Sequence, residues 1–314
     1  MSFGILFPGQ GSQQVGMGSD VFETRADLLG ERADRVLGFS LMEMCLDGPQ
    51  EELTRTEYAQ PALFAVSFAL WEALRDALEQ HHPSGAAGHS LGEYTALAAA
   101  GLFDFDIGLD LVARRGKAMG EAASRDSSGM AALIGADLET AEAVCRDRRE
   151  AGGYLQVANV NSPGQIVVAG AASDIEWLAE NARDLGVRRA IPLDVAGGFH
   201  SDFMLPARDA LGEALDAAPI NELAFPVWAN TTARPHIVES VAETLSRQLV
   251  EPVLFSASLE DMFHSGIDTF IHVGPGDVTA GLARRTLSEA NVLVVSSLAE
   301  IDAAVEAIVT MGDS

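Results

Sequence analysis

The chain has 314 residues, 48% hydrophobic and 21% charged, which is enough to bury a large globular core. Its formal charge of −26 repels nucleic acid and disfavours anionic membranes. No run reaches the roughly 18 apolar residues of a membrane span, and the first residues lack a basic leader, so we expect a cytoplasmic protein. Cys45 and Cys145 fit neither a disulfide framework nor a metal site.

Apolar runs flanked by Gly and Pro alternate with longer segments of 3.6-residue periodicity, which is typical of an α/β fold. Residues 3–7 predict a buried strand that ends in the Gly-rich loop 8–13. Residues 61–78 predict a helix that leads to a short strand at Ala86 and Ala87, and residues 106–122 predict a further helix.

The pattern changes after residue 129. It then predicts strand 130–134, helix 138–149, strands 155–161 and 165–169, helix 173–185 and strand 189–193. This order fits an inserted ferredoxin-like domain, which we assign to residues 126–195. The α/β pattern resumes with helix 203–217, strand 227–229, helix 237–249, strand 269–273 and helix 279–287. We therefore expect a large α/β-hydrolase-like catalytic domain formed by residues 1–125 and 196–314.

The first candidate for a nucleophile is Ser90, in the sequence Gly88-His-Ser-Leu-Gly-Glu93. A Gly-x-Ser-x-Gly turn between a strand and a helix places the serine on a sharp corner, with its hydroxyl exposed. Such a hydroxyl is protonated at neutral pH, so it needs a base within hydrogen-bonding distance.

His200 is the candidate base, because it follows the predicted strand 189–193 and two glycines, Gly197 and Gly198, that let the backbone turn. We expect that strand to lie beside the nucleophile strand. No carboxylate completes a triad convincingly, since Asp194 and Asp202 are too near His200 in sequence. A backbone carbonyl can orient a neutral imidazole instead.

The other histidines are interpreted structurally. His89 is expected to support the turn with its side chain directed away from the serine hydroxyl. His272 ends a predicted strand and is expected to pack or to hydrogen bond there, whereas His81 and His82 lie in a polar turn and are expected to be solvated.

Nine stretches in order resemble the malonyl-CoA:acyl carrier protein transacylases and the acyltransferase domains of polyketide synthases. They are Phe7-Pro-Gly-Gln-Gly-Ser-Gln13, Gly16-Met-Gly18, Gln60-Pro-Ala62, Gly88-His-Ser-Leu-Gly-Glu-Tyr94, residues 115–119, Asn159-Val-Asn-Ser-Pro-Gly-Gln165, Gly198-Phe-His200, Arg247-Gln-Leu249 and Val273-Gly-Pro-Gly276. The resemblance implies an enzyme that moves malonyl from malonyl-CoA to the phosphopantetheine thiol of acyl carrier protein, for fatty acid or polyketide synthesis.

The resemblance also implies roles for single residues. Ser90 would be acylated, His200 would be its base, and the backbone N–H groups of Gln10 and Leu91 would form the oxyanion hole. Arg115 would bind the acyl carboxylate through two parallel hydrogen bonds, although without this motif its position would favour a helix C-terminal cation.

Three further positions follow from the resemblance. Gln248 would line the site and orient His200 through its main-chain carbonyl, and Asn161 would lie near the acyl pocket. Phe199 together with Leu91 resembles the malonyl-selective members, in which bulk excludes a 2-methyl branch. The small Gly197-Gly198 pair could loosen this pocket.

No metal or organic cofactor is implied, and we expect a monomer. Because the expected carrier is acidic, we predict that it docks on a local arginine cluster, with Arg188, Arg189, Arg284 and Arg285 as candidates. Glu251 departs from the family pattern, and it would either repel anionic substrates at the mouth of the site or face solvent.

Two alternative functions remain at this point. One is a hydrolase on the same fold that releases acyl groups from carrier protein to water, and the loss of Arg115 would have favoured it. The other is a catalytically inert interaction module, which the retention of both Ser90 and His200 disfavours.

Overall fold

The computed structural model describes residues 2–312, which form two β-sheets. The first sheet is parallel, with strand order β7-β2-β1-β8-β9, and consists of β1 (Phe3–Phe7), β2 (Gly85–Gly88), β7 (Val227–Trp228), β8 (Thr269–Val273) and β9 (Asn291–Val295). The second is antiparallel, with order β4-β5-β3-β6, and consists of β3 (Ser128–Ile134), β4 (Leu155–Ser162), β5 (Gln165–Ala171) and β6 (Arg189–Pro192).

Helices surround both sheets. They are α1 (Ser19–Thr24), α2 (Ala26–Leu29), α3 (Glu31–Leu37), α4 (Leu41–Leu46), α5 (Gln50–Thr54), α6 (Thr56–Leu78), α7 (Leu91–Ala99), α8 (Phe105–Ala123), α9 (Leu138–Glu150), α10 (Ala172–Asn181), α11 (Leu205–Ala217), α12 (Val241–Gln248), α13 (Phe255–His264), α14 (Val278–Thr286) and α15 (Ile301–Gly312). Short 3₁₀ turns cover Asp202–Met204, Val238–Ser240 and Leu298–Glu300. Within residues 2–312, no helix combines the length and the apolar character needed to cross a membrane.

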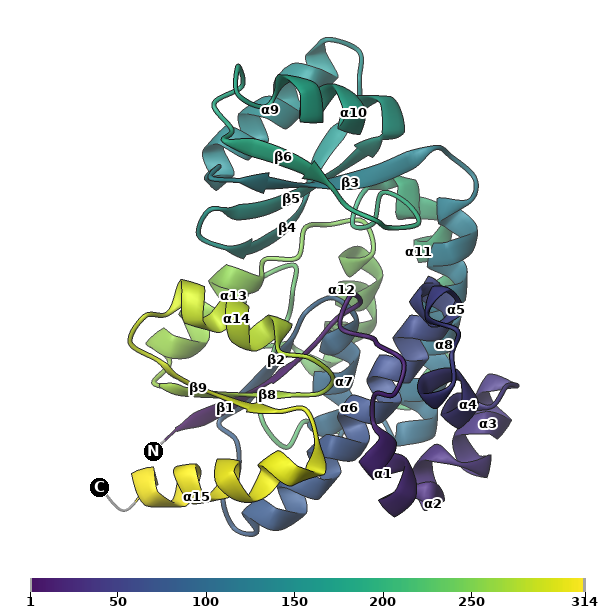
Figure 1. Cartoon of the computed structure of the whole chain (residues 1–314), viewed down its shortest axis with the longest axis vertical. Coiled ribbons are helices and arrows are strands. Elements are labelled where there is room, and N and C mark those ends of the chain that lie inside the picture. Colours follow the sequence, from purple (N-terminus) through teal and green to yellow (C-terminus); the bar gives the residue numbers. More distant parts are fainter. Residues whose placement is uncertain (1, 313–314) are drawn as a thin grey trace.

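The antiparallel sheet lies in the upper part of an elongated molecule and the parallel sheet in its lower part (Figure 1). Helices α9 and α10 cover the outer face of the antiparallel sheet, and its buried side chains form a core cluster of their own. Helices α13 and α14 lie between the parallel sheet and strand β4, while α6 and α15 lie on the far side of the parallel sheet (Figure 1). All five residues of β1 are buried, as expected for a parallel strand covered on both faces.

Strand β4 also binds the chain that follows helix α12. Val160 N–H donates to the carbonyl of Val253 at 2.8 Å, and Val253 N–H donates to the carbonyl of Ala158 at 2.9 Å. The side-chain amide of Gln156 donates to the carbonyl of Val250 at 2.9 Å. The antiparallel sheet therefore fixes the position of a segment that belongs to the other half of the molecule.

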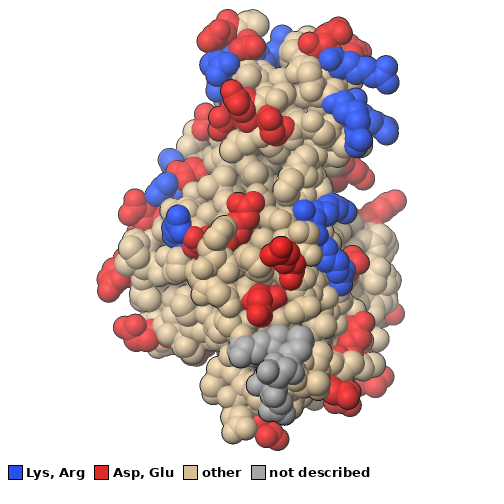
Figure 2. Space-filling model, turned by 90° about the vertical axis from the view of Figure 1, so that its left-hand side faces the viewer, with Lys and Arg blue, Asp and Glu red and all other residues tan. Residues whose placement is uncertain are grey.

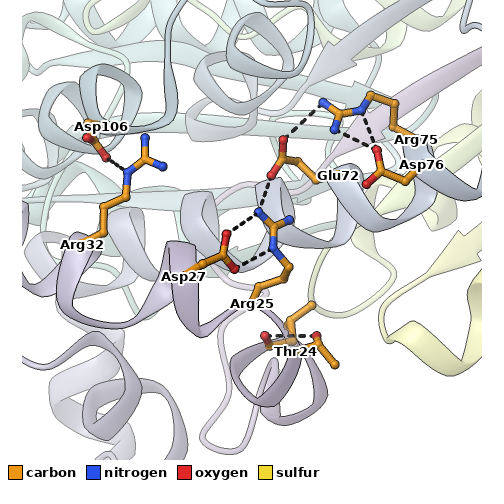
Figure 3. A network of polar contacts seen from close by, with 9 residues as sticks. Thr24, Arg25, Asp27, Arg32, Glu72, Arg75, Asp76 and Asp106 are labelled. Atoms are coloured by element: carbon orange, nitrogen blue, oxygen red, sulfur yellow. Dashed lines mark hydrogen bonds and ion pairs between the residues drawn. The ribbon is translucent and has the colours of Figure 1, made fainter.

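A polar network joins the first helices to α6 (Figure 3). Arg25, which separates α1 from α2, donates to Asp27 and to Glu72, at 3.0 and 2.7 Å. Glu72 also pairs with Arg75 one turn further along α6, at 3.2 Å. Partly exposed ion pairs of this kind stabilise little, so the network mainly sets where these helices lie.

Most predicted elements are present, and the strand and helix order predicted for residues 130–193 is found. Helix α6 begins at Thr56, five residues before the Pro61 that was expected to start it, so Pro61 lies inside the helix. The sequence patterns did not predict α1 to α5, α13, β9 or α15. The first five of these helices have only four to seven residues, too few to show a helical period.

Substitution of Gly88 should destabilise the fold strongly. A Cβ atom at Gly88 would overlap the backbone of Gly92 and Glu93, whereas one at Gly212, within α11, meets no atom within 4 Å. We expect Gly88→Ala to lower the free energy of unfolding by about 3 kcal/mol or more. Gly212→Ala should raise it by about 0.5 to 1 kcal/mol. Thermal denaturation of the two variants checks this contrast, and similar melting temperatures would contradict it.

Candidate active site

Ser90 lies on a sharp turn between β2 and α7, at the carboxyl end of the parallel sheet. Its φ angle is 50°, in the left-handed region that non-glycine residues rarely adopt. The side-chain oxygen of Asn230 accepts from Ser90 N–H at 2.8 Å, and the amide of Asn230 donates to the carbonyl of Gly88 at 2.7 Å. These two bonds hold the strained turn from the loop after β7.

His200 is hydrogen bonded to the Ser90 hydroxyl. The Oγ–Nε2 distance is 2.8 Å, and the other ring nitrogen, Nδ1, donates to the backbone carbonyl of Gln248 at 2.7 Å. Because Nδ1 is the donor, Nε2 is free to accept the serine proton. Burial, together with the charge of Arg115, lowers the pKa of His200 to about 3, so the ring is neutral at pH 7 and its Nε2 is free of a proton.

Arg115, on α8, brings a buried cation to the same place, with only 1% of its surface exposed. One terminal nitrogen donates to Ser90 Oγ and to Gln248 Oε1, both at 2.9 Å, and the other donates to Gln60 Oε1 at 2.8 Å. The guanidinium lies 5.4 Å from the ring centre of Tyr94.

No carboxylate contacts the Arg115 guanidinium directly, although the charge of the buried Glu93, which lies beyond the Gln248 amide, partly opposes the lowering of its pKa. The Nε atom of Arg115 has no hydrogen bond, and no Asp or Glu side chain in residues 2–312 forms an ion pair with the guanidinium. Burial lowers the pKa of Arg115, because removal from water disfavours the charged form of the guanidinium. An anionic ligand at this position would relieve that penalty.

The loop after β1 packs against the serine turn. A Cβ atom at Gly9 would overlap the carbonyl of His89, so glycine permits this approach. Gln10 follows in the loop and lines the pocket, and its side chain donates to Thr56 Oγ1 at 3.2 Å. Leu91 begins α7, where N–H groups lack helical acceptors.

A pocket of about 250 Å³ opens between the two sheets in front of Ser90. Its walls include Gln10, Leu91 and Arg115 from the parallel-sheet side, and Asn161 and Phe199 from the antiparallel-sheet side and the loop that leaves it. Further apolar lining comes from Met119, Met130, Val167, Leu193, Val195, Val278 and Leu282.

All the predicted site residues meet here except that Gln248 lies behind the pocket wall, where it contacts Ser90, His200 and Arg115. One expectation is wrong: β6, the strand before His200, does not lie beside β2 but pairs with β3 in the antiparallel sheet. His200 reaches the serine because the loop after β6 returns to the parallel sheet.

The four other histidines interpreted from the sequence differ in their contacts and exposure. His89 directs its Nε2 to Asn161 Oδ1 at 2.7 Å, away from the serine hydroxyl. His272 is buried against Thr279 and the carbonyl of Gly274, and burial lowers its pKa to about 4. His82 is exposed, whereas His81 is only partly so.

Several other predicted features lie outside the pocket. Glu251 forms two hydrogen bonds with Arg247 one turn away, at 2.8 and 2.9 Å, and does not line the pocket. Cys45 and Cys145 are free and buried, and burial raises the pKa of each thiol to about 12.

Four polar residues of the site with buried side chains were not predicted from the sequence: Gln60, Glu93, Asn230 and His236. Gln60 holds Arg115 and Asn230 holds the serine turn, while Glu93 contacts Gln248, Asn230 and His236. A usable signal existed for Gln60 and Glu93, since both lie within the stretches that carry the family resemblance.

Comparison with known proteins places these features in context. The model of the acyl transferase domain family matches residues 5–310. The malonyl CoA-acyl carrier protein transacylase of Bacillus subtilis is 39% identical over 313 residues, which cover 99% of this chain and 98% of the relative. The polyketide biosynthesis malonyl CoA-acyl carrier protein transacylase PksC of Bacillus subtilis is 37% identical over 290 residues, which cover 92% of this chain and 98% of the relative. A solved complex of a type II polyketide synthase acyl-carrier protein with its malonyl-transacylase matches with a TM-score of 0.92 and 35% identity, over 98% of this chain and 99% of the transacylase.

The low pKa of His200 predicts how the reactivity of Ser90 depends on pH. A neutral fluorophosphonate should modify Ser90 at a nearly constant rate from pH 7.5 to pH 5.5, because the base stays unprotonated as the pH falls. A histidine with an ordinary pKa of about 6.5 would retain only about one tenth of its basic form at pH 5.5. The charge of Arg115 contributes to the low pKa of His200, so Arg115→Gln should raise that pKa. The modification rate should then begin to fall at a higher pH than in the wild type. A wild-type modification rate that falls to half of its maximum near pH 6.5 would refute this prediction.

Proposed function

This chain belongs to the acyl transferase family, and we propose on that basis that it moves a malonyl group from malonyl-CoA to the phosphopantetheine thiol of acyl carrier protein. The observation that carries the proposal is the buried Arg115 guanidinium, which touches Ser90 Oγ and forms no direct ion pair with a carboxylate within residues 2–312. Such a group selects an acyl chain that ends in a carboxylate, as malonyl does.

The first half of the reaction would acylate the serine. Ser90 Oγ attacks the thioester carbonyl while His200 Nε2 accepts its proton, and the backbone N–H groups of Gln10 and Leu91 stabilise the oxyanion. The carbon–sulfur bond then breaks, and His200 returns the proton to the departing thiolate of coenzyme A. Removal of one oxyanion donor typically costs about 3 to 4 kcal/mol of transition-state stabilisation.

The second half would repeat these steps with a different thiol. The carrier thiol loses its proton to His200 and attacks the malonyl ester of Ser90. Collapse of the new tetrahedral intermediate breaks the bond to Ser90 Oγ, and His200 returns the proton to that oxygen. The chemistry thus needs no metal or organic cofactor, since nucleophile, base, oxyanion donors and carboxylate clamp all come from the protein.

A preference for malonyl over branched acyl groups is supported by two apolar side chains. Leu91 is 1% exposed and Phe199 is 7% exposed, and both line the pocket beside the nucleophile. Asn161 lines the same pocket near the proposed acyl position. One methyl group changes binding by only about 1 to 3 kcal/mol, so these contacts would give a preference and not an exclusion.

The finer architecture is also a proposal. The parallel sheet with its serine turn supports an α/β-hydrolase-like domain of residues 1–125 and 196–314, and the strand order β4-β5-β3-β6 supports a ferredoxin-like domain of residues 126–195. We further propose that the protein acts as a monomer in the cytoplasm, where its two free thiols would stay reduced.

Radiolabelled malonyl-CoA tests the proposed function. Brief mixing should place a stable label on the wild-type protein, and that label should pass to added acyl carrier protein. Ser90→Ala should take up no label, because the ester cannot form. Release of coenzyme A without accumulation of label would indicate the hydrolase instead. A wild-type protein that takes up no label and releases no coenzyme A would indicate an inert module.

The docking surface for the carrier would be a positively charged patch on a protein whose net charge is −26. On the face shown in Figure 2, Lys and Arg side chains gather at two levels along one edge. Arg188 and Arg189 are exposed at β6, and Arg284 and Arg285 are exposed at the end of α14. Arg285 donates to Gln165, a residue of the pocket wall, at 2.6 Å, so Arg285 lies at the rim of the pocket.

Charge reversal tests this docking surface. We expect the double variant Arg284→Glu, Arg285→Glu to raise the KM for acyl carrier protein, while slow hydrolysis of malonyl-CoA stays as in the wild type. Arg35→Glu, an exposed reversal on α3, is the control and should leave the carrier KM unchanged. Unaltered carrier kinetics in the double variant would exclude this surface.

A further inference from the structure

A buried carboxylate lies one helical turn after the nucleophile, and the proposed reaction does not use it directly. Glu93 has no exposed surface. Its Oε2 atom accepts from Gln248 Nε2 at 2.7 Å and from Asn230 N–H at 3.2 Å, and its Oε1 atom accepts from His236 Nε2 at 2.6 Å. Both oxygens are therefore used as acceptors, by donors from three different segments.

The partner that matters is Gln248, because an amide side chain has two chemically different ends. Its nitrogen donates to Glu93 and to the carbonyl of Ser90, at 2.7 and 2.8 Å. Its oxygen accepts from Arg115 at 2.9 Å. If the amide were reversed, its nitrogen would face the guanidinium donors and its oxygen would face the carboxylate, and both contacts would be repulsive.

The carboxylate thus sets the direction of the whole chain of contacts. A carboxylate only accepts hydrogen bonds, so it admits the nitrogen end of the amide and rejects the oxygen end. His236 holds the carboxylate from its other side, and the side chains of both partners are fully buried. With the amide fixed, its oxygen holds the terminal nitrogen of Arg115 that also contacts Ser90 Oγ.

We propose that Glu93, anchored by His236, is a positioning residue that orients the Gln248 amide and thereby aims the Arg115 guanidinium at the acyl carboxylate. This inference rests on the proposed malonyl transfer. It makes the Glu93–His236 pair a specificity device, since an acyl group without a carboxylate gains nothing from an aimed guanidinium. The orientation of His200 depends on the main-chain carbonyl of Gln248 and not on its side chain.

The test compares two acyl donors on one enzyme. Loading of Ser90 by malonyl-CoA and by acetyl-CoA is measured by intact-protein mass spectrometry over a range of concentrations. Glu93→Gln places an N–H at one of the two acceptor positions, so we expect the ratio of malonyl to acetyl kcat/KM to fall about 10- to 100-fold, mainly through the malonyl KM. Asp174→Asn, a buried carboxylate of α10 that binds Arg148, should leave this ratio unchanged.

Variants of His236 keep the inference testable if Glu93→Gln folds poorly. His236→Leu removes the donor to Glu93 and should lower the malonyl to acetyl ratio. His236→Gln offers a replacement N–H at similar reach and should restore most of it. Equal ratios in the two variants would argue that the residue only fills space, and would overturn the proposal.

A double-mutant cycle shows whether Glu93 acts through Arg115. In an Arg115→Gln background, Glu93→Gln should lower malonyl loading far less than it does in the wild type. Additive losses, or parallel losses of malonyl and acetyl loading, would overturn the positioning role while malonyl transfer itself stands. A wild-type enzyme that malonyl-CoA does not load would instead refute the proposed function, and this inference with it.

Discussion

The site depends on one constraint, which is the burial of a guanidinium group without a carboxylate in direct contact with it. Removal of such a cation from water costs several kcal/mol, which only well-placed oxygen atoms and a bound anion can offset. The chain supplies oxygens from three elements, with Gln60 on α6, Ser90 before α7 and Gln248 at the end of α12. Because these elements must converge on Arg115, the packing of the helices and the reactivity of the serine are linked.

Both halves of the molecule contribute residues to the pocket. The parallel sheet holds the nucleophile, helix α8 brings the cation, and the chain leaving the antiparallel sheet brings the base. Strand β4 joins both parts, since Gln156 binds the carbonyl of Val250, just after Gln248, and more weakly, at 3.4 Å, that of His200. A shift between the sheets would therefore alter the Ser90–His200 distance.

Features set by local spacing could be predicted from the sequence. The serine turn, the helix that bears Arg115 and the order of elements from 130 to 193 depend on residues close together in the chain. The place of β6, by contrast, depends on its pairing with β3 about 55 residues earlier, and the contact of Glu93 with His236 spans 143 residues. Nothing in a single sequence selects such partners. Helices α1 to α5 were missed because tertiary packing, and not periodicity, holds such short segments.

The backbone at Ser90 and His200 connects activity with stability. Both residues have left-handed φ angles, 50° and 57°, although neither is glycine. Each such conformation costs about 1 to 3 kcal/mol, which the surrounding hydrogen bonds must offset. Glycine at either position would relieve the strain but would also remove a side chain that the site needs, so activity requires the protein to keep a backbone conformation that costs it stability.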